Sequence, residues 1–259
     1  MTEFAVRAAD LRVLNSLTKY PSIPTYHELD PRNGGLLPTV TSFSGSVIAT
    51  EKVDGTNSRL VLLPDGTYLI GSREELLYAQ GDLIGNPALG IVEQLKPVAS
   101  RLIDQHDGTL RVYYLELYGG KVGGAAKQYT RDASTFGWRL FDVLELADWP
   151  TALTWPPSRI ATWRESGGQP FADESTLLKL ADAAELELTP RLFTLPAADL
   201  PTTIEATLDL LRATLPTTRV SLDPALEGTS EGMVFRTETR TTIAKARFQD
   251  YERTLKRRR

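Results

Sequence analysis

Cysteine is absent from this 259-residue sequence, and the only two histidines, His27 and His106, lie far apart along the chain. The absence of cysteine excludes disulfide bonds, thiolate catalysis and cysteine-ligated zinc. With only two distant histidines, we expect neither a histidine-based metal site nor a histidine-centred catalytic triad. The sequence has no run of about 18 apolar residues, and its start lacks the basic-then-apolar layout of a secretion signal. We therefore expect a cytoplasmic protein with no membrane partner.

The chain also lacks an overall excess of positive charge, since its net charge is −4 at pH 7. That balance alone argues against a nucleic-acid partner. The charge is unevenly distributed, however: residues 245–259 contain seven basic and two acidic residues, so the rest of the chain carries −9. A basic cluster supplies the salt-dependent attraction to phosphates that nucleic-acid binding requires. The basic tail, residues 253–259, is the candidate for such binding. The alternative for its last four residues, Lys256–Arg259, is a solvated tail or the end of a helix, where cations are favourable.

Hydrophobic periodicity predicts an α+β fold in which antiparallel sheets are flanked by helices. Residues 64–66 (Pro-Asp-Gly) should turn two strands into a hairpin, and Pro97 should break or kink the helix that contains it. Residues 148–168, rich in Trp and Pro, show no clear periodicity and are expected to form a loop. No domain boundary is visible, which favours a single domain over residues 1–259. The expected strands are 46–53, 59–63, 67–70, 110–118, 137–146, 232–237 and 241–247, and the expected helices are 4–17, 87–104, 172–185 and 200–215.

The most informative segment is Glu51–Asn57 (Glu-Lys-Val-Asp-Gly-Thr-Asn), which lies between two apolar strands. It places a single lysine, Lys52, beside a tight Asp-Gly turn at the end of a buried strand. A lysine amine acts as a nucleophile when it is unprotonated and aimed at an electrophile, which burial and neighbouring cations can achieve. The alternative is that Asp54 and Gly55 only form a hairpin turn between the two strands.

This segment resembles the Lys-x-Asp-Gly motif of the covalent nucleotidyltransferases, which include RNA ligases, DNA ligases and mRNA capping enzymes. Its fuller form is most similar to the RNA-ligase-2-like branch. One short motif recurs by chance, but segments that resemble the family's other motifs follow in the correct order, so that the resemblance spans roughly residues 18 to 250. They are Lys19–Ile23 (N-terminal signature), Gly71–Arg73 (motif Ia), Tyr114–Gly119 (motif III), Trp138–Val143 (motif IIIa), Glu231–Phe235 (motif IV) and Ile243–Arg247 (motif V).

The resemblance implies a ligase-type nucleotidyltransferase (adenylation) fold and an ATP-dependent RNA ligase, an enzyme of RNA repair. Lys52 would attack the α-phosphate of ATP and form a lysyl-AMP intermediate. The AMP would move to a 5′-phosphate end of RNA, at a nick or a free end, and a 3′-hydroxyl would then displace it and seal the strand. Mg²⁺ or Mn²⁺ would assist as the metal cofactor.

Strand alternation identifies further candidates for the site. Glu116 shares a strand face with Val112 and Tyr114, and a carboxylate on such an apolar face needs a partner. The resemblance assigns Glu116 to the ribose of the nucleotide; the alternative is a rim glutamate that faces water. Lys245 and Arg247 are two residues apart, so they project from one face, where two cations repel each other unless an anion lies between them. A triphosphate is one candidate anion, and a surface salt bridge is the alternative.

The resemblance implies the roles of five more residues. Phe141 would stack on the purine, a task that suits flat aromatic surface, although a strand Phe is usually core. Glu231 would hold the divalent metal, because carboxylates are hard oxygen ligands; an exposed strand-end glutamate would look the same. Arg73 and Asn57 would touch the phosphate, the ribose or the nucleic-acid end, and Glu51 joins them as a predicted nucleotide-binding residue.

Two features depart from the pattern of the relatives. Arg247 stands where RNA-ligase relatives usually carry a second lysine, which keeps the charge but changes the geometry. The sequence also ends about a dozen residues after motif V, so we expect an adenylation core without a C-terminal domain, and end binding would then depend on the basic tail or on a partner protein. Three alternatives remain: a DNA-ligase-like or GTP-using capping-type enzyme, a degenerate relative that only binds nucleic acid, and an unrelated interaction module.

Overall fold

A computed structural model describes residues 5–86, 90–103 and 106–258, apart from the side chains of Val6 and Arg258. The strands are β1 (His27–Leu29), β2 (Leu36–Val40), β3 (Ser46–Lys52), β4 (Thr56–Leu62), β5 (Tyr68–Ser72), β6 (Leu76–Ala79), β7 (Asp82–Leu83), β8 (Leu110–Gly119), β9 (Phe136–Leu146), β10 (Arg191–Pro196), β11 (Gly232–Thr237) and β12 (Ile243–Arg247). The α-helices are α1 (Leu11–Leu17), α2 (Ile91–Leu102), α3 (Ala126–Tyr129), α4 (Trp149–Ala152), α5 (Pro157–Glu165), α6 (Glu174–Ala183), α7 (Ile204–Thr214) and α8 (Phe248–Arg258), and 3-10 helices cover Val6–Ala8 and Ala197–Asp199.

The described strands form antiparallel sheets, which confirms the predicted α+β fold. The large sheet has the order β7-β6-β5-β4-β8-β9, and the small sheet has the order β10-β3-β11-β12. The strands β1 and β2 form a separate pair. β4 and β5 are joined by the predicted hairpin at residues 64–66, where Leu63 N donates to Thr67 O across 2.8 Å.

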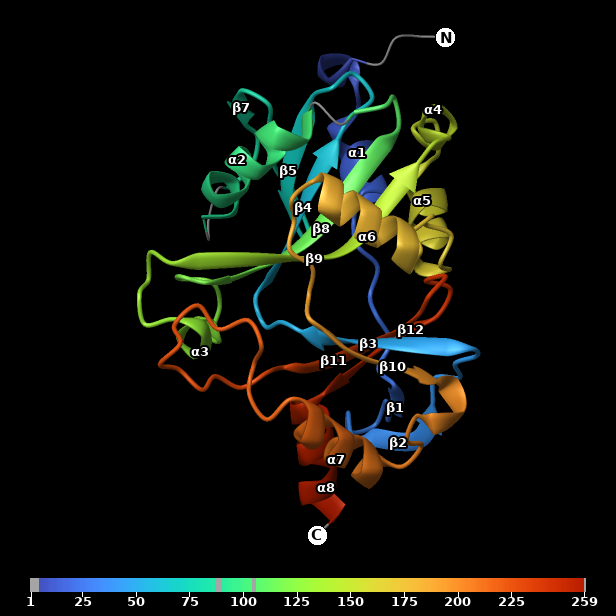
Figure 1. Ribbon diagram of the computed structural model, residues 1–259. Coiled ribbons are helices and arrows are strands. Elements are labelled where there is room, and N and C mark those ends of the chain that lie inside the picture. The colour runs from blue at the N-terminus through green and yellow to red at the C-terminus, as the bar shows by residue number, and fades with distance from the viewer. Residues whose placement is uncertain (1–4, 87–89, 104–105, 259) are drawn as a thin grey trace.

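Helices cover both faces of the large sheet (Figure 1). On one face, α2 and α6 pack against apolar residues that include Leu115 of β8. On the other face, α1, α4 and α5 pack against residues that include Tyr114. Successive residues of β8 thus enter opposite cores, which explains why this strand is apolar along nearly all of its length.

Among the described residues, helices cover one face of the small sheet. Val47 and Ala49 of β3 and Phe235 of β11 are buried against α7 and α8. In Figure 1 these helices lie below the small sheet, and the large sheet lies above it. Because side chains alternate along a strand, Thr50 and Lys52 of β3 project from the opposite face, toward the large sheet.

Two sequence-based expectations about helices need correction. The helix expected over 4–17 begins only at Leu11, because the Asp10 carboxylate accepts from the N–H of Arg12 (2.8 Å) and caps α1; Phe4 lies outside the described residues. The helix expected over 87–104 is α2, with 87–89 and 104 outside the described residues. Pro97 does not end it, since α2 continues to Leu102 and its apolar side is buried against the large sheet. That burial outweighs the local cost of a proline.

Residues 148–168 are not the predicted loop, because they contain α4 and α5. Pro157 occupies the first position of α5, where a missing N–H costs nothing. Ile160 is fully buried against α1 and its neighbours, and Arg164 donates to Ser16 O (3.1 Å). These helices are short and begin with Trp or Pro, so they show too little hydrophobic periodicity to be predicted from the sequence.

The basic tail is helical as far as it is described, since residues 253–258 are the last turns of α8. Arg253 donates to Gly34 O and Arg257 donates to Asn33 O (2.8 Å), so both side chains fasten α8 to the turn that joins β1 and β2. Residues 256–258 are therefore helical, as the helix-end alternative predicted, although Arg257 is exposed. Within the described part of the chain, no helix has the length and apolar content needed to cross a membrane.

Candidate active site

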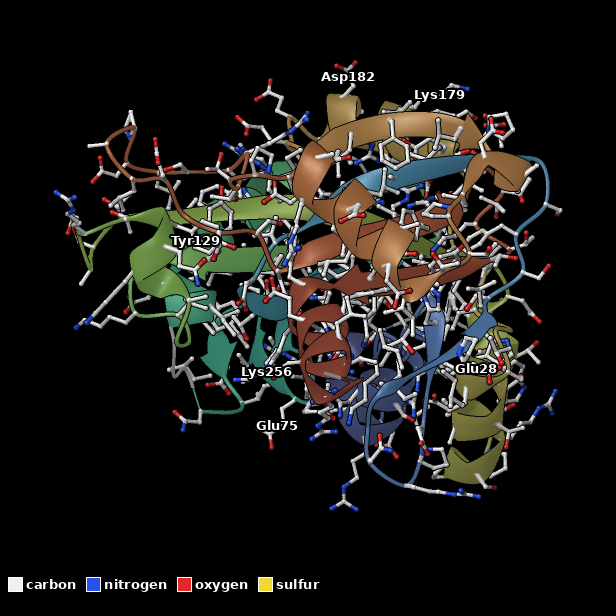
Figure 2. The ribbon with its side chains drawn as sticks, turned by 90° about the horizontal axis from the view of Figure 1, so that it is seen from below. Glu28, Glu75, Tyr129, Lys179, Asp182 and Lys256 are labelled. Atoms are coloured by element: carbon white, nitrogen blue, oxygen red, sulfur yellow. The ribbon has the colours of Figure 1, made fainter. Side chains whose placement is uncertain are left out.

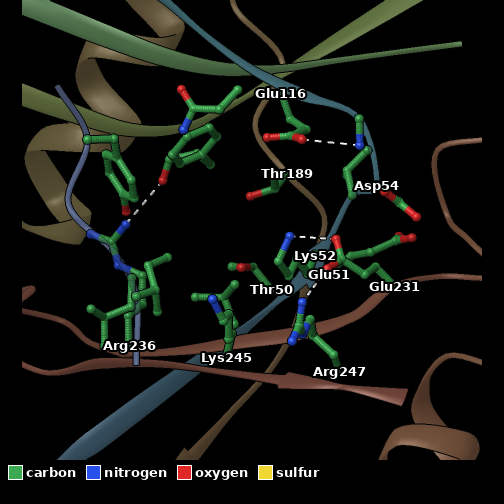
Figure 3. A pocket seen from close by; sticks show the side chains of 18 of the residues that line it. Thr50, Glu51, Lys52, Asp54, Glu116, Thr189, Glu231, Arg236, Lys245 and Arg247 are labelled. Carbon is green, nitrogen blue, oxygen red and sulfur yellow. Dashed lines mark hydrogen bonds and ion pairs between the residues drawn. The ribbon is translucent and has the colours of Figure 1, made fainter. Parts of the chain in front are cut away.

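A cavity of about 390 Å³ lies between the two sheets, where the polar face of the small sheet meets β4, β8 and β9 (Figure 3). The small sheet contributes the last three residues of β3 and alternate residues of β11 and β12, and the large sheet and its turns contribute the opposite wall. All nine predicted site residues line this cavity: Glu51, Lys52, Asn57, Arg73, Glu116, Phe141, Glu231, Lys245 and Arg247.

Lys52 ends β3 and projects into the cavity. Its Nζ lies 2.5 Å from Oε2 of Glu231, and Oε1 of Glu231 lies 3.9 Å from Arg247 (Figure 3). This contact follows from the sheet register, because Gly232 of β11 is paired with Lys52 and Glu231 precedes it. The side chains of Lys52 and Glu231 are 25% and 21% exposed, so a ligand in the cavity can reach both.

The turn after Lys52 connects the two sheets and is not a hairpin. β3 pairs with β10 and β11, whereas β4 pairs with β5 and β8, so the hairpin alternative for Asp54 and Gly55 is wrong. Asp54 N donates to Tyr129 OH (2.8 Å), and Gly55 N donates to Oε1 of Glu116 (3.1 Å). A Cβ on Gly55 would lie 2.2 Å from Leu117 O, so only glycine fits this close approach.

Glu116 lies in β8 directly opposite Asn57 of β4. Burial raises the pKa of Glu116 to about 7, and the nearby Lys52 offsets part of that effect while Glu231 adds to it. Asn57 Oδ1 is buried, and no hydrogen-bond donor reaches it from the described residues. The two side chains therefore present acceptor groups to the cavity, as a site for sugar hydroxyls would require.

Lys245 and Arg247 share one face of β12, as the sequence predicted, and both line the cavity. Burial lowers the pKa of Lys245, and the positive charges of Arg247 and Lys52 act in the same direction. The Arg247 guanidinium is held by Asp250, with Nε and Nη2 at 2.8 and 3.1 Å from its two oxygens. Three cations thus converge on one wall, which favours a polyanionic ligand.

The remaining predicted residues differ in their exposure. Phe141 is partly buried and contacts Tyr20 edge to face, with ring centroids 5.0 Å apart. Arg73 is exposed at the rim of the cavity. Glu51 borders the cavity, but its carboxylate accepts from the Thr218 hydroxyl (2.6 Å) and from Arg219 N (2.9 Å). Glu51 therefore fastens the segment before β11 to β3, and its contact with a nucleotide stays a prediction.

Sequence reasoning missed several residues of this cavity. Thr50 and Arg236 could have been found, because each lies two residues from a predicted or motif position on the same strand face. Thr189 also lines the cavity, but it comes from a segment with no recognised motif. Tyr129, which holds the Asp54 backbone, carries no sequence signal at all.

A buried polar cluster behind Phe141 was also missed. Oδ2 of Asp142 in β9 accepts from Tyr20 OH (2.8 Å) and from Arg240 Nε (2.7 Å), and Oδ1 lies 3.6 Å from Arg236 Nη1 in β11. Burial raises the pKa of Tyr20, with the Arg240 charge opposing that shift. The cluster joins the large sheet to the small sheet at one end of the cavity.

Comparisons with known proteins identify the family and the fold of this chain. A family model described as RNA ligase matches residues 45–256. The chain is also similar to solved structures of an RNA ligase from Naegleria gruberi. A variant without ligand gives a TM-score of 0.55 at 13% identity, covering 82% of this chain and 52% of that one. A second variant, with ATP and Mn, gives a TM-score of 0.53 at 15% identity and covers 82% of this chain and 52% of that one. A third, also with ATP and Mn, gives a TM-score of 0.55 at 13% identity and covers 93% of this chain and 63% of that one.

At these identities the likeness shows the fold, which is that of an RNA-ligase nucleotidyltransferase domain. The chain spans about half the length of the first of these solved structures. No match was found among curated proteins.

Proposed function

Because this chain belongs to the RNA ligase family, we propose that it is an ATP-dependent RNA ligase that works through a lysyl-AMP intermediate on Lys52. The observation that carries this proposal is the position of Lys52 Nζ. It lies in a cavity where Lys245 and Arg247 form a cationic wall and Glu116 and Asn57 form the facing wall. A nucleophilic amine beside sites for a polyphosphate and a sugar is the arrangement that nucleotidyl transfer needs.

In the first step, Lys245 and Arg247 would hold the triphosphate of ATP, Glu116 and Asn57 would accept from the ribose hydroxyls, and Phe141 would stack on the purine. The Lys52 amine would attack the α-phosphorus; a P–N bond forms and the P–O bond to pyrophosphate breaks. The ammonium must lose a proton before it attacks. Glu231 Oε2, at 2.5 Å, is the hydrogen-bond acceptor placed to receive that proton.

The site residues fit a divalent cation that binds chiefly to the nucleotide. The described residues contain no group of three or more His, Cys, Asp or Glu that could form an all-protein metal site. Mg²⁺ and Mn²⁺ commonly use one or two carboxylates together with substrate phosphates, and Glu231 supplies a carboxylate beside the cationic wall. Mn accompanies ATP in four of the Naegleria structures. When bound, such an ion would neutralise charge that develops on the phosphates.

In the later steps, a 5′-phosphate oxygen of RNA would attack the AMP phosphorus, and the Lys52 amine would leave. A 3′-hydroxyl would then displace AMP and join the strands. The contribution of Lys245, Arg247 and Asn57 to these steps is to orient the phosphates and stabilise their charge. A partner protein that helps to bind ends stays a prediction, as does a cytoplasmic location.

The direct test is incubation of the protein with α-labelled ATP and Mg²⁺, followed by intact-mass and peptide analysis. We expect one added AMP on Lys52, and complete loss of the adduct in Lys52→Ala and Lys52→Arg. Lys179→Ala, at an exposed position of α6, is the matched control and should label as the wild type does. An undiminished adduct in Lys52→Ala would overturn the proposal. Labelling by GTP in place of ATP would favour the capping-type alternative, and sealing of DNA in place of RNA would favour the DNA-ligase alternative.

A further inference from the structure

A second cavity, of about 660 Å³, meets the first one at Asp54 and Glu231. It lies between α7, α8, Gln128 of α3 and the segment that leads into β11. Asp54 and Glu231 line both cavities, so the Lys52–Glu231 ion pair stands where the two meet. None of the roles proposed above uses this second space.

The wall formed by α7 and α8 is predominantly basic. It carries Arg212, Arg253 and Lys256 against one acid, Glu252, which pairs with Arg212 (3.2 Å). Lys256 is exposed, and no ion-pair partner for it lies among the described residues. Figure 2 shows Lys256 on α8, on the side of the helix nearer to α3 and Tyr129. The wall therefore offers at least one uncommitted cation to an anionic ligand.

Apart from Asp54 and Glu231, which it shares with the first cavity, the rest of the lining is neutral or apolar. Leu215, Pro216 and Phe248 provide apolar surface, and Gln249 provides hydrogen-bonding groups. This combination suits a single polynucleotide strand: the cations can bind its phosphates, the aromatic ring can stack on a base, and the amide groups can form hydrogen bonds with its sugars and bases. A free inorganic anion would need only the cations.

The cavity wall is also tied to the strand that carries Lys52. Glu51 holds Thr218 and Arg219, and the Thr229 hydroxyl donates to Gln128 Oε1 across 2.6 Å. Thr218 and Arg219 follow the lining residue Pro216, so these bonds hold the segment next to the wall, and they are present without a ligand. A preformed wall lowers the ordering cost of binding a strand end.

We propose that this second cavity receives the 5′-phosphorylated end of the polynucleotide and delivers its phosphate to the lysyl-AMP. This inference rests on the proposed function, because it assigns a place to the second substrate of that reaction. In the transfer step AMP fills the first cavity, so the 5′-phosphate must reach Lys52 by another approach. An oxygen of the 5′-phosphate forms a P–O bond to the AMP phosphorus, and the P–N bond between that phosphorus and Lys52 breaks. The electron pair of the P–N bond returns to Nζ, which takes up a proton.

The test uses two variants and one matched control. Lys256→Glu reverses the uncommitted charge, and Thr229→Trp fills the cavity with bulk at an exposed position. Lys179→Glu makes the same charge change on α6, on the far side of the molecule in Figure 2. Each protein is first labelled with α-labelled ATP, and the lysyl-AMP is then chased with a 5′-phosphorylated RNA 12-mer, its 5′-hydroxyl counterpart or the matching DNA.

We expect Lys256→Glu and Thr229→Trp to form lysyl-AMP as the wild type does but to need roughly tenfold more 5′-phosphorylated RNA for half-maximal transfer, with the Lys256→Glu effect shrinking at high salt. Lys179→Glu should behave as the wild type in both steps. Fluorescence anisotropy should show that the wild type binds the 5′-phosphorylated RNA more tightly than the 5′-hydroxyl RNA and that Lys256→Glu loses this preference. Wild-type transfer by both variants, or equal binding of the two RNAs by the wild type, would overturn the inference. Failure of the wild type to form lysyl-AMP would instead overturn the proposed function.

Discussion

At the scale of single residues, Glu116 is a cavity carboxyl whose charge changes near neutral pH. Burial raises its pKa from the ordinary value of 4.5 to about 7. Its Oε1 accepts from Gly55 N, so the same carboxylate helps to fix the turn that follows Lys52. A carboxylate that is half ionised near neutral pH would bind a ribose most strongly above pH 7, where it is a full acceptor.

Glu116→Gln should change the pH dependence of stability. Because the folded-state pKa is raised, the protonated carboxyl contributes stability that is fully present below about pH 4.5 and is lost as the pH rises through 7. The wild type should therefore lose up to about 3 kcal/mol between pH 5 and pH 8 from this group, and the glutamine variant should not. Urea unfolding at both pH values measures this, with Glu93→Gln at an exposed position of α2 as the control. If the free energy of unfolding depends on pH in the same way in the wild type and in Glu116→Gln, the burial of Glu116 does not destabilise the protein at high pH and the prediction is wrong.

At the scale of elements, α8 has two roles, packing against the small sheet and lining the second cavity, whereas the sequence indicated only a basic tail. One side is buried: Tyr251 packs in the core under the small sheet, and Thr254 Oγ1 accepts from Leu36 N across 2.9 Å. Another side carries Arg253 and Lys256 into the second cavity. Deleting the tail after Tyr251 would thus remove structural contacts together with charge, so point variants separate the two tasks better than truncation does.

Thr254→Val tests the structural task alone. The substitution keeps the shape of the side chain but removes the acceptor that Thr254 provides for the Leu36 N–H at a buried position. We expect the free energy of unfolding to fall by about 1–2 kcal/mol, with lysyl-AMP formation retained in the folded protein. Thr162→Val, at an exposed position of α5, is the matched control and should change stability by less than about 0.5 kcal/mol. Equal stability of the two variants in urea unfolding would contradict a structural role for α8.

At the scale of the whole molecule, the relative position of the two sheets decides whether the cavity exists. Two features described above join the sheets: the turn after Lys52 and the cluster around Asp142. Asp142 is fully buried in β9, while Arg236 belongs to β11 and Arg240 to the turn that follows it. These charges are compensated only when both sheets are in place, so the cluster favours one relative arrangement.

Asp142→Asn should therefore be strongly destabilising. It leaves the buried guanidinium groups of Arg236 and Arg240 without their shared carboxylate, which typically costs about 3–5 kcal/mol. Glu187→Gln is the matched control: it breaks an ion pair with Arg139 in which Glu187 is exposed, and it should cost less than about 1 kcal/mol. Thermal unfolding of both variants measures the difference. A Tm for Asp142→Asn within a degree of the control would show that the cluster does not hold the sheets together.

Alternation along single strands let the sequence determine much of the site by itself. The shared faces of Lys245 and Arg247 and of Glu116, Val112 and Tyr114 depend only on the two-residue period of a strand, so they could be predicted without a fold. The order of the motifs identified the family. The resemblance to that family then indicated which strands would contribute residues to the same site. For the same reason, all nine predicted residues line the cavity.

Only the tertiary structure decided which distant groups would meet. The contacts of Asp54 with Tyr129, of Glu51 with Thr218 and of Asp142 with Arg240 join residues 75, 167 and 98 positions apart. No local periodicity encodes such pairs, because they depend on how two sheets and their connecting segments pack. The short helix α5 and the continuation of α2 through Pro97 have the same cause, since burial against a neighbour outweighed the local preference. The second cavity exists for this reason too: its walls come from segments that are adjacent only after α7 and α8 have packed against the small sheet.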